Sequence, residues 1–485
     1  MLGSGAGGLQ VSYSFGRLGV GHAVLSADPL PGGMFRHFPL FQRLITWTKP
    51  FAPAGRGSRE YQRYDWNSLL AEEAPHQALV ADFMDGTSYF PSRPAMAESL
   101  STFADRAGVQ VRYECHWEGV TRDGDEFVIT TSDGEYRCEA LVVAVGMTQP
   151  WKPPIPGLEH VPHYVETRAA KQYADKRVFV IGKRNSGFEI ADGLLPWARQ
   201  IVLGSPRPAR ISVLMHSTAA ARARYLQPYE DHVLGGGVRV LDASIERVDR
   251  TGEGYRVTAK GTTTPGEWAF EMDEVIAATG FAAPLGDLPD LGVATFFQGR
   301  LPAQTPYWES ASVPGVYFAG SITQGSIGLK KYGIPSNSAA VHGFRYNARV
   351  LAGHIARAHF GVELDRPAVP REQVVPFLLA EVSRGPEVWN QQSYLARALS
   401  VDQGGALLDE GIVPLQHFVD APGPDAVAVT VETDDSGDIH PAVYVRRGGN
   451  VDEHTLPSNS MLDFETAEHR AQLEGLIAGL NPEGG

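Results

Sequence analysis

A glycine-rich hexapeptide at the start of the chain has the spacing that binds a dinucleotide. Residues Gly3–Gly8 read Gly-Ser-Gly-Ala-Gly-Gly, a G-x-G-x-x-G pattern that opens a helical stretch over Leu9–Leu18. The first glycine makes a tight turn, the second lets a pyrophosphate approach the backbone, and the third packs the helix against a strand. The helix N-terminus then faces the anion. We therefore predict cofactor contacts at Gly3, Gly5, Gly7 and Gly8.

The surroundings of this turn depart from the usual pattern in two ways. Only Met1 and Leu2 precede it. We therefore expect most of the first strand to be missing, as with a late start site or a trimmed chain. The acidic residue expected after the second strand, His22–Leu25, to hold the ribose hydroxyls is Ser26. Asp28, two positions further on, is the predicted substitute.

A second glycine turn follows a complete strand. The apolar segment Lys176–Ile181 leads into Gly182–Gly187, which precede a helix over Phe188–Trp197 and a strand over Gln200–Leu203. Strand, glycine turn, helix and strand in this order form a unit that binds a dinucleotide. Arg184 replaces the middle glycine, which narrows access to the backbone and adds a cation near the phosphates. We predict cofactor contacts at Gly182, Lys183, Arg184, Asn185, Ser186 and Gly187.

The residues after this unit bear on the choice of nicotinamide nucleotide. The second strand runs into Gly204–Arg207, without the carboxylate that would hold the free ribose hydroxyls of NADH. Ser205 and Arg207 suit a 2′-phosphate instead, so NADPH is predicted over NADH. The alternative, arginines that are simply solvated, stays open.

Three more apolar strands end in small residues. They are Leu141–Gly146, Val275–Gly280 and Val316–Gly320. Small residues let the chain cross beside a bound dinucleotide. Thr279, Gly280 and Gly320 are therefore predicted cofactor contacts, and a helix from about Ser336 to Phe360 should follow the last strand.

The order of these strands predicts one nucleotide-binding domain inserted into another, because the whole second unit lies between the first two. The expected fold class is α/β, with two Rossmann-like, three-layer dinucleotide-binding domains and a C-terminal α+β extension. The predicted limits are 1–150 and 273–360 for the two parts of the outer domain, 151–272 for the inserted domain, and 361–485 for the extension.

The extension differs sharply in charge from the rest of the chain. Residues 361–485 contain 21 acidic residues, seven arginines and no lysine, whereas residues 1–360 hold 35 acidic and 35 basic residues. Such a shift marks a domain boundary. A lysine-free acidic segment argues against nucleic acid or an anionic membrane as a partner, and we expect a solvated surface.

The pattern within the extension changes from helices to strands. The predicted elements are helices over Val374–Val382 and Val388–Leu399, then strands over Ala426–Val431 and Ala442–Val445. Asp434–Asp438 between the strands is typical of a hairpin turn. A calcium loop is disfavoured because its sixth and twelfth positions hold Ile439 and Val445 instead of glycine and glutamate.

Composition and cysteine usage narrow the class further. A hydrophobic fraction of 43% and a charged fraction of 20% are typical of soluble globular proteins, and neither a membrane-spanning run nor a signal peptide is visible. We therefore expect a cytoplasmic enzyme. Cys115 and Cys138 form neither a Cys-x-x-Cys pair nor a metal cluster, so no internal dithiol and no metal site are predicted.

Several motifs together resemble flavin-containing monooxygenases. They are the two glycine turns, Gly32-Gly33-Met34-Phe35, Ala278-Thr279-Gly280-Phe281 and Phe318-Ala319-Gly320. The similarity is closer to the endoplasmic-reticulum flavoprotein oxidoreductases and their bacterial relatives. The segments that carry this are Asp65–Leu70, Tyr89-Phe90-Pro91, Asn185–Glu189, His342–Tyr346 and His440-Pro441.

This resemblance implies FAD on the outer domain and hydride delivery from NAD(P)H on the inserted one. In the monooxygenases, reduced flavin forms a C4a-hydroperoxyflavin that oxidises nitrogen, sulfur or a carbonyl, while the protein positions the reactants and excludes water. The resemblance places Gly33, Met34 and Phe35 against the cofactor. It also places Thr48 and Lys49 beside the flavin as catalytic candidates, with His342, Lys330 and Lys331 near them.

Two departures from the family pattern leave alternatives open. Thr48 stands where relatives carry an asparagine, and the long Phe-x-Gly…His fingerprint of the oxygenases is missing. The first hypothesis is an NADPH-dependent FAD monooxygenase that uses molecular oxygen on a small molecule or a carrier-bound intermediate. The others are a flavin dehydrogenase or oxidase without oxygen insertion, and a non-catalytic FAD-binding partner protein. A homo-oligomer stays open.

Overall fold

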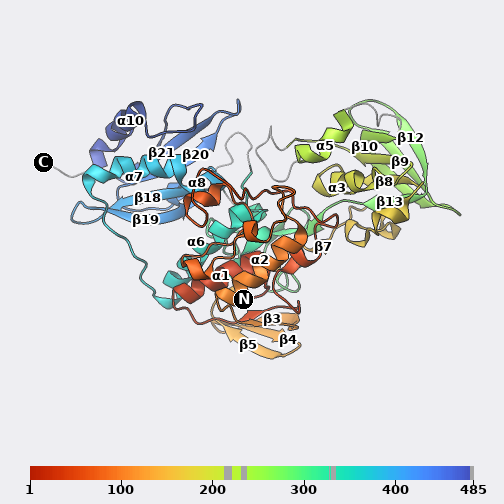
Figure 1. The fold of residues 1–485 in the computed structure, drawn as a ribbon. Coiled ribbons are helices and arrows are strands. Elements are labelled where there is room, and N and C mark those ends of the chain that lie inside the picture. Colours follow the sequence, from red (N-terminus) through yellow and green to blue (C-terminus); the bar gives the residue numbers. More distant parts are fainter. Residues whose placement is uncertain (212–220, 231–236, 327, 329–334, 481–485) are drawn as a thin grey trace. The chain divides into compact units, whose positions relative to one another are not determined.

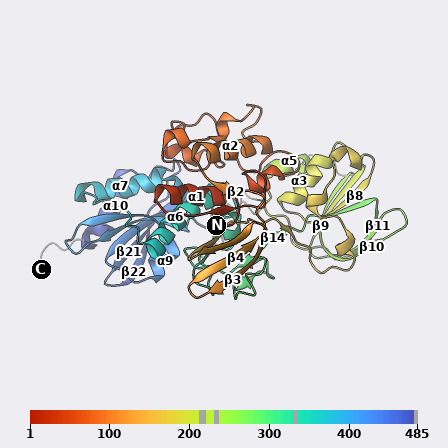
Figure 2. The same cartoon turned by 90° about the horizontal axis from the view of Figure 1, so that it is seen from below.

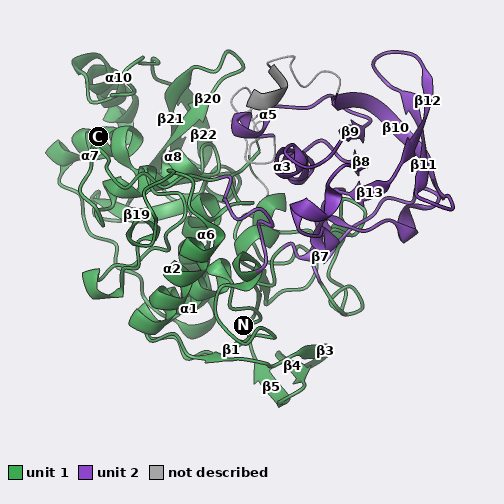
Figure 3. Cartoon of the chain, turned by 45° about the vertical axis from the view of Figure 1, so that its right-hand side comes forward, with its two compact units in different colours: residues 1–36, 46–146, 285–485 green, residues 37–45, 147–284 purple. Residues whose placement is uncertain are grey.

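The chain forms two compact units in the computed structural model (Figure 3). One comprises residues 1–36, 46–146 and 285–485, and the other comprises residues 37–45 and 147–284. Each is described by itself below. The structure describes residues 1–211, 221–230, 237–326, 328 and 335–480.

The first unit is built on a parallel sheet whose central position is held by Leu2. Two parallel strand pairs form its sides: β6 (Leu141–Val143) with β17 (Val316–Phe318), and β1 (Val24–Leu25) with β2 (Val111–Arg112). Leu2 bridges both pairs: its N–H donates to the Val142 carbonyl at 2.9 Å, and its carbonyl accepts from Ala144 N–H at 2.7 Å. Residues Met1 and Leu2 therefore suffice to join the two pairs, although little of the first strand precedes the turn.

Two helices cover this sheet and pack on each other. They are α1 (Ala6–Arg17) and α6 (Val341–Phe360), whose apolar faces share one core with the strands. The expected helix from Ser336 begins later, at Val341, and ends at Gly361, whose φ of 62° is the left-handed conformation that commonly ends helices. A third helix, α2 (Arg93–Arg106), is capped at its N-terminus by Ser92, whose hydroxyl accepts from Ala95 N–H at 3.1 Å.

Small antiparallel elements complete this part of the unit. They are the hairpin sheet of β3 (Trp117–Asp123), β4 (Glu126–Thr131) and β5 (Gly134–Cys138), seen beside α1 in Figures 1 and 2, and the pair β15 (Thr295–Phe296) and β16 (Leu301–Pro302).

The second unit contains a six-stranded sheet in the order β12-β11-β10-β9-β8-β13, with parallel pairing from β13 to β10. Its strands are β8 (Arg177–Ile181), β9 (Gln200–Ser205), β10 (Val238–Arg250), β11 (Tyr255–Gly261), β12 (Glu267–Met272) and β13 (Glu274–Ala277). The other elements are α3 (Asn185–Leu194), α5 (Ala223–Glu230) and the short pair β7 (Gln149–Pro150) and β14 (Phe281–Ala282).

The position of β13 corrects the predicted domain limit between residues 272 and 273. β13 pairs with β8 along Glu274–Ala277, so it belongs to the sheet of the second unit, which continues to residue 284. The sequence placed this strand in the outer domain because an apolar strand that ends in small residues fits either sheet.

The residues from 361 onward form an antiparallel sheet and belong to the first unit. The strand order is β19-β18-β20-β21-β22, with bounds Leu407–Pro414, Leu395–Val401, Ala426–Thr433, Ile439–Arg447 and Asn450–Thr455. Helices α7 (Arg371–Arg384), α8 (Pro386–Asn390) and α10 (Ala467–Ile477) pack on one face, and α9 (Leu415–Asp420) packs on the other (Figures 1 and 2).

The predicted strands over Ala426–Val431 and Ala442–Val445 are confirmed, as is the turn between them. Asp434 accepts from the N–H groups of Ser436 and Asp438 at 2.9 Å. The prediction of a helix over Val388–Leu399 is wrong, because α8 ends at Asn390 and β18 begins at Leu395. The segment Leu395–Leu399 consists of leucine, alanine and arginine, which favour a helix intrinsically, and the packing of β18 within the sheet overrides that preference.

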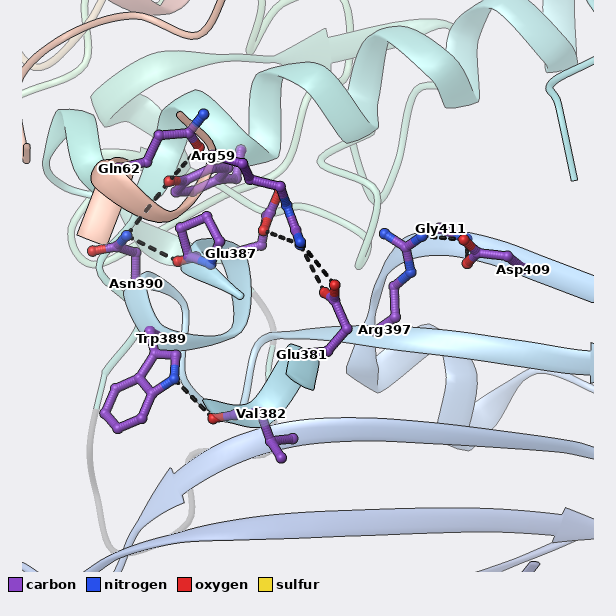
Figure 4. Close-up of polar contacts among 12 residues, drawn as sticks. Arg59, Gln62, Glu381, Val382, Glu387, Trp389, Asn390, Arg397, Asp409 and Gly411 are labelled. Carbon is purple, nitrogen blue, oxygen red and sulfur yellow. Dashed lines mark hydrogen bonds and ion pairs between the residues drawn. The ribbon is translucent and has the colours of Figure 1, made fainter. Parts of the chain in front are cut away.

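A cluster of ion pairs fastens the C-terminal helices to the rest of the first unit. Arg59 donates to both carboxylate oxygens of Glu381 at 2.7 Å and to Glu387 at 2.7 Å (Figure 4). Glu387 is 1% exposed and also pairs with Arg349 of α6. Glu381 and Glu387 are therefore buried ion-pair partners, which corrects the expectation that the acidic residues of the extension simply face solvent.

Among the described helices, none combines the length and the apolar character that spanning a bilayer requires.

Glu387→Gln should destabilise the full chain by about 3–5 kcal/mol, because removing one partner of a buried ion pair leaves uncompensated charge. Burial raises the pKa of Glu387, but Arg349 and Arg59 outweigh burial and lower the pKa from 4.5 to about 2. The stabilisation is therefore complete above pH 4.5 and is lost as the pH falls towards 2. Urea unfolding at several pH values measures both effects.

Glu60→Gln is the matched control. Glu60 pairs with Arg384 at 3.4 Å, but both side chains are about half exposed. Exposed pairs of this kind contribute about 0–1 kcal/mol, so this variant should stay close to the parent. An equal loss of stability in the two variants would contradict the importance of the buried pair.

Candidate functional site

The first glycine turn is held by a close approach of two backbone segments. Gly3 has a φ of +106°, and a Cβ there would lie 2.5 Å from the Ala144 carbonyl oxygen. A Cβ on Gly8 would lie 2.0 Å from the Gly3 carbonyl oxygen. Real Cβ atoms do not come this close to oxygen, so both positions require glycine.

The second turn repeats this construction in the other unit. Gly182 has a φ of +132°, and its Cβ would lie 2.3 Å from the Ala278 carbonyl oxygen. A Cβ on Gly187 would lie 2.2 Å from the Gly182 carbonyl oxygen. Ala144 follows β6 and Ala278 follows β13, so each turn rests on a parallel neighbouring strand. Both units therefore carry a turn of the dinucleotide-binding type.

Gly5 differs from the other glycines of its turn because it faces open space. Its φ is −72°, and the nearest atom to a Cβ there is the Gly33 Cα at 3.9 Å. Gly7, in contrast, packs against Gly320, whose Cα would lie 2.4 Å from a Cβ on Gly7. Gly5 caps α1, and no side chain bonds the first amides of that helix. These amides and Gly5 are the part of the turn that could receive a pyrophosphate.

The predicted ribose contact lies next to this turn. Ser26 is 3% exposed and its hydroxyl lies 2.8 Å from that of Ser4, so Ser26 is a structural residue. A carboxylate oxygen of Asp28 lies 4.0 Å from the position of a Cβ on Gly33. Gly33 in turn approaches Gly5, so the Asp28 carboxylate is available beside the turn. Met34 and Phe35 continue from Gly33 in a short 3-10 helix and are half-buried.

Thr48 does not have the environment of a catalytic residue. Its side chain is fully buried: the hydroxyl donates to Asp65 at 2.8 Å and accepts from the Asn67 amide at 3.0 Å. A hydroxyl with these partners and no exposed surface cannot touch a reacting atom, so its role is to position the neighbouring segment. Lys49, which follows it, has an exposed side chain and is held through its N–H, which donates to Tyr64 O at 2.8 Å.

An aromatic stack that the sequence did not predict lies next to Thr48. The Trp66 ring lies 4.0 Å from the ring of Trp47 on one side and 4.0 Å from that of His342 on the other, nearly parallel to both. His342 is fully buried in the first turn of α6. In the sequence, Trp66 stands between two polar residues, Asp65 and Asn67, and this pattern was the signal that could have indicated the stack. The other two candidates, Lys330 and Lys331, lie outside the described residues.

Two side chains of the second turn, and Thr279 after β13, are committed to contacts within the protein. Lys183 is 3% exposed and pairs with Asp242. Asn185 accepts from Arg222 N–H at 3.1 Å, and Thr279 donates to the Trp151 carbonyl at 2.5 Å. These contacts hold the backbone of the turn and of the segments beside it in place. Ser186, in the first turn of α3, is half-buried.

Arginines gather at the open side of the second turn. Burial lowers the pKa of Arg184, and the nearby charges of Arg207 and Arg210 lower it further. Arg184 caps α3, while Arg207 and Arg210 follow β9, after Ser205. Three cations that repel one another at the N-terminal end of a helix favour a bound anion. The sequence predicted cofactor contacts at Arg184 and Arg207, but it gave no sign that Arg210 lies near them.

Glu189 of α3 attaches residues 37–45 to the second unit. Its carboxylate accepts from Phe41 N–H at 3.2 Å and from the Tyr164 hydroxyl at 2.9 Å. Burial raises the pKa of Glu189 to about 7, although these hydrogen bonds oppose the shift. A Cβ on Gly193 would meet the Phe41 ring at 2.6 Å, so this segment packs closely on α3.

The thiols and possible metal ligands offer no further chemistry. Both cysteines are free; Cys115 is buried, and burial raises the pKa of Cys138. Across the residues described, no cluster of three or more His, Cys, Asp or Glu side chains could hold a metal ion.

A family model described as pyridine nucleotide-disulphide oxidoreductase matches residues 1–320. The FAD-dependent oxidoreductase domain-containing protein 2 of Mus musculus is 26% identical over 434 residues, which are 82% of this chain and 63% of the mouse protein. The chain thus spans less than two thirds of that relative. The ferredoxin–NADP reductase of Thermus thermophilus is 30% identical over 217 residues, 42% of this chain and 60% of the reductase.

Solved structures share the fold at low identity. Bacillithiol disulfide reductase from Bacillus cereus has a TM-score of 0.55 at 20% identity and covers 73% of this chain and 97% of its own. A mutant flavin monooxygenase from Stenotrophomonas maltophilia also has a TM-score of 0.55 at 20% identity, covering 73% and 96%. The predicted fold class, with two Rossmann-type domains, is confirmed. The predicted cofactors, FAD and NADP(H), follow from the match to the family model.

Gly5→Val should abolish FAD binding while the chain stays folded. The backbone at Gly5 accepts a side chain, and a Cβ meets no protein atom closer than 3.9 Å. The valine methyl groups would instead fill the space at the N-terminus of α1. Flavin absorbance per protein and circular dichroism measure the two effects. Full flavin occupancy in this variant would contradict the placement of the pyrophosphate.

Arg207→Ala should raise the KM for NADPH by about tenfold or more and leave the KM for NADH nearly unchanged. The loss of one charge-assisted hydrogen bond to a 2′-phosphate is worth about 1.5–3 kcal/mol. Arg199→Ala is the control, because Arg199 is exposed and pairs with Asp175. Equal changes for both nucleotides in the Arg207 variant would contradict a 2′-phosphate contact.

Proposed function

The chain belongs to the pyridine nucleotide-disulphide oxidoreductase family, and we propose that it is an NADPH-reduced FAD monooxygenase acting on a small molecule or a carrier-bound intermediate. FAD supplies the hydride acceptance and the oxygen chemistry when bound. The residues of this chain bind the flavin and orient it.

In the proposed complex, the two turns bind and orient the dinucleotides. Gly5 and the first amides of α1 receive the FAD pyrophosphate, and Asp28 accepts hydrogen bonds from its ribose hydroxyls. Arg184 and Arg207 hold the 2′-phosphate of NADPH. Thr48, bonded to Asp65 and Asn67, keeps the Trp47 segment in place.

The observation that carries the proposal is the lack of a Cys-x-x-Cys pair whose disulphide could accept electrons from the flavin. The chain has two cysteines, which are free, and the thiol of Cys138 is held protonated by the burial that raises its pKa. Thiol exchange requires a thiolate, so an internal disulphide route is disfavoured. Oxygen is the acceptor that needs no further protein group. The aromatic stack of the half-buried Trp47 and Trp66 with the buried His342 offers a surface that helps to exclude water.

A second candidate is a flavin dehydrogenase or oxidase without oxygen insertion. The observation that favours it is Thr48, which replaces the asparagine of the oxygenases and has no exposed surface. The similarity to ferredoxin–NADP reductase over part of the chain agrees with electron transfer to a partner protein.

Rapid mixing separates the two functions. We expect that protein reduced with NADPH under argon and then mixed with oxygen recovers the oxidised flavin spectrum only after a delay. We also expect little immediate release of hydrogen peroxide. The measurement is stopped-flow absorbance together with a peroxide assay, with NADP⁺ present and absent. Immediate recovery of the oxidised spectrum with one peroxide per NADPH would support the second candidate and contradict the first.

A further inference from the structure

A cavity lies within the first unit, away from the glycine turn. Its volume is about 700 Å³, and α6, β18, β19 and α9 contribute to its walls. It reaches α1 at Ser14, Arg17 and Leu18, near the C-terminal end of that helix. Ser14 follows Gly5 by nine residues, which corresponds to about 13 Å along a helix. The volume lies in the range of about 300–1,000 Å³ typical of small-molecule sites.

The cavity lining carries an excess of positive charge. It contains seven arginines, four carboxylates and two histidines. The arginines are Arg17, Arg59, Arg349, Arg357, Arg366, Arg397 and Arg446, and the carboxylates are Glu72, Asp365, Glu387 and Glu410. Three of these arginines come from residues 361–485, a segment with a net charge of −14. Three of the seven cations of this acidic segment therefore line the cavity.

Most of the arginines are neutralised by neighbouring carboxylates. Arg59 and Arg349 pair with Glu387, and Arg17, Arg366 and Arg397 pair with Glu72, Glu410 and Asp409 (Figure 4 shows the pairs of Arg59 and Arg397). Two arginines remain: neither Arg357 nor Arg446 has a carboxylate partner among the residues that the structure describes.

Arg446 is a buried cation without a counter-ion. It is 6% exposed, and its guanidinium donates to the carbonyl oxygens of Phe418 and Pro424 and lies 4.4 Å from the Phe418 ring centroid. Its Nε has no hydrogen-bond partner, and burial lowers its pKa. A buried charge is costly unless it is paired. An anion in the cavity would supply the missing partner.

Two histidines and a tyrosine line the cavity together with the two unpaired arginines. His354 stacks on Tyr307 at 4.1 Å with an angle of 11°, and His417 meets the Tyr307 ring edge-on at 4.8 Å. Burial lowers the pKa of His417, and the charges of Arg446 and Arg357 lower it further. Both arginines therefore act on the same imidazole. A doubly charged anion would relieve this repulsion, and protonated histidines would then add to its binding.

We propose that this cavity binds a phosphate-bearing small molecule, with its phosphate between Arg357, His417 and Arg446. Two guanidinium groups and the His417 imidazole match the double charge of a phosphate ester better than the single charge of a carboxylate. The remaining volume accommodates the organic part of the ligand beside Tyr307 and His354. This site is separate from both glycine turns, so the proposal stands apart from the redox function.

Calorimetric titration with inorganic pyrophosphate tests the site. The protein is used as the full chain with FAD bound and with saturating NADP⁺, so that both dinucleotide sites are occupied. We expect saturable binding by the parent protein and none of acetate at the same ionic strength. Absence of pyrophosphate binding, or equal binding of acetate, would overturn the proposal.

Variants then locate the binding. Arg446→Met keeps the apolar part of the side chain and should weaken pyrophosphate at least tenfold, as should Arg357→Gln. Arg357 is exposed, so its variant folds even where the buried substitution does not. Arg447→Met is the control: neighbouring strand residues point to opposite faces, and Arg447 instead bonds Leu476 O. Unchanged binding in both site variants, or an equal loss in the control, would refute the assignment.

Discussion

The contact between the first glycine of each turn and a backbone carbonyl is the constraint on which both units depend. In each, the chain leaves a parallel strand and turns at a positive φ against the carbonyl oxygen of an alanine in the neighbouring strand. The turn then closes when the last glycine of the pattern packs on the carbonyl of the first. No side chain fits at either contact, whereas the middle position is open in the first unit and carries Arg184 in the second. Glycine is therefore required where each turn packs on its own backbone. The two units differ at the middle position of the turn, which holds Gly5 in one and Arg184 in the other.

That difference sets the chemistry of each turn. In the proposed complex, the open backbone at Gly5 would let a pyrophosphate reach the amides of α1, whereas Arg184 occupies the corresponding position of the second turn, near Arg207 and Arg210. The amides are fixed by the helix, which suits a cofactor that stays bound. The arginine side chains must be ordered around a bound phosphate at a cost in conformational entropy, which suits a nucleotide that exchanges.

The sequence predicted the parts of the molecule that depend on local backbone sterics. Both turns, the insertion of one nucleotide-binding unit in the other and the hairpin at Asp434 were visible because glycine spacing and turn residues leave few alternatives. The burial of Thr48 was not visible, since it depends on Asp65 and Asn67, which the fold brings to it. The strand at Leu395 was misread because its leucine, alanine and arginine residues favour a helix intrinsically, and only the packing of the sheet overrides this. The counter-charges of Glu381 and Glu387 lie more than 300 positions from Arg59 in the sequence, and no local pattern connects them.

Helix α6 connects the aromatic stack of the first unit with the cavity in the same unit. Its first turn supplies His342 to the aromatic stack, and Arg345 on the same turn donates to the carbonyl oxygens of Ser68 and Gln62. Further along, Arg349, Gly353 and Arg357 recur every four residues, which places them on one face of the helix, and all three line the cavity. Two of the cations of the cavity, Arg349 and Arg357, are therefore positioned by a helix that is packed on α1, not by a loop. Because a rigid element fixes their spacing, less ordering is needed when an anion binds, and a larger share of the electrostatic attraction contributes to affinity.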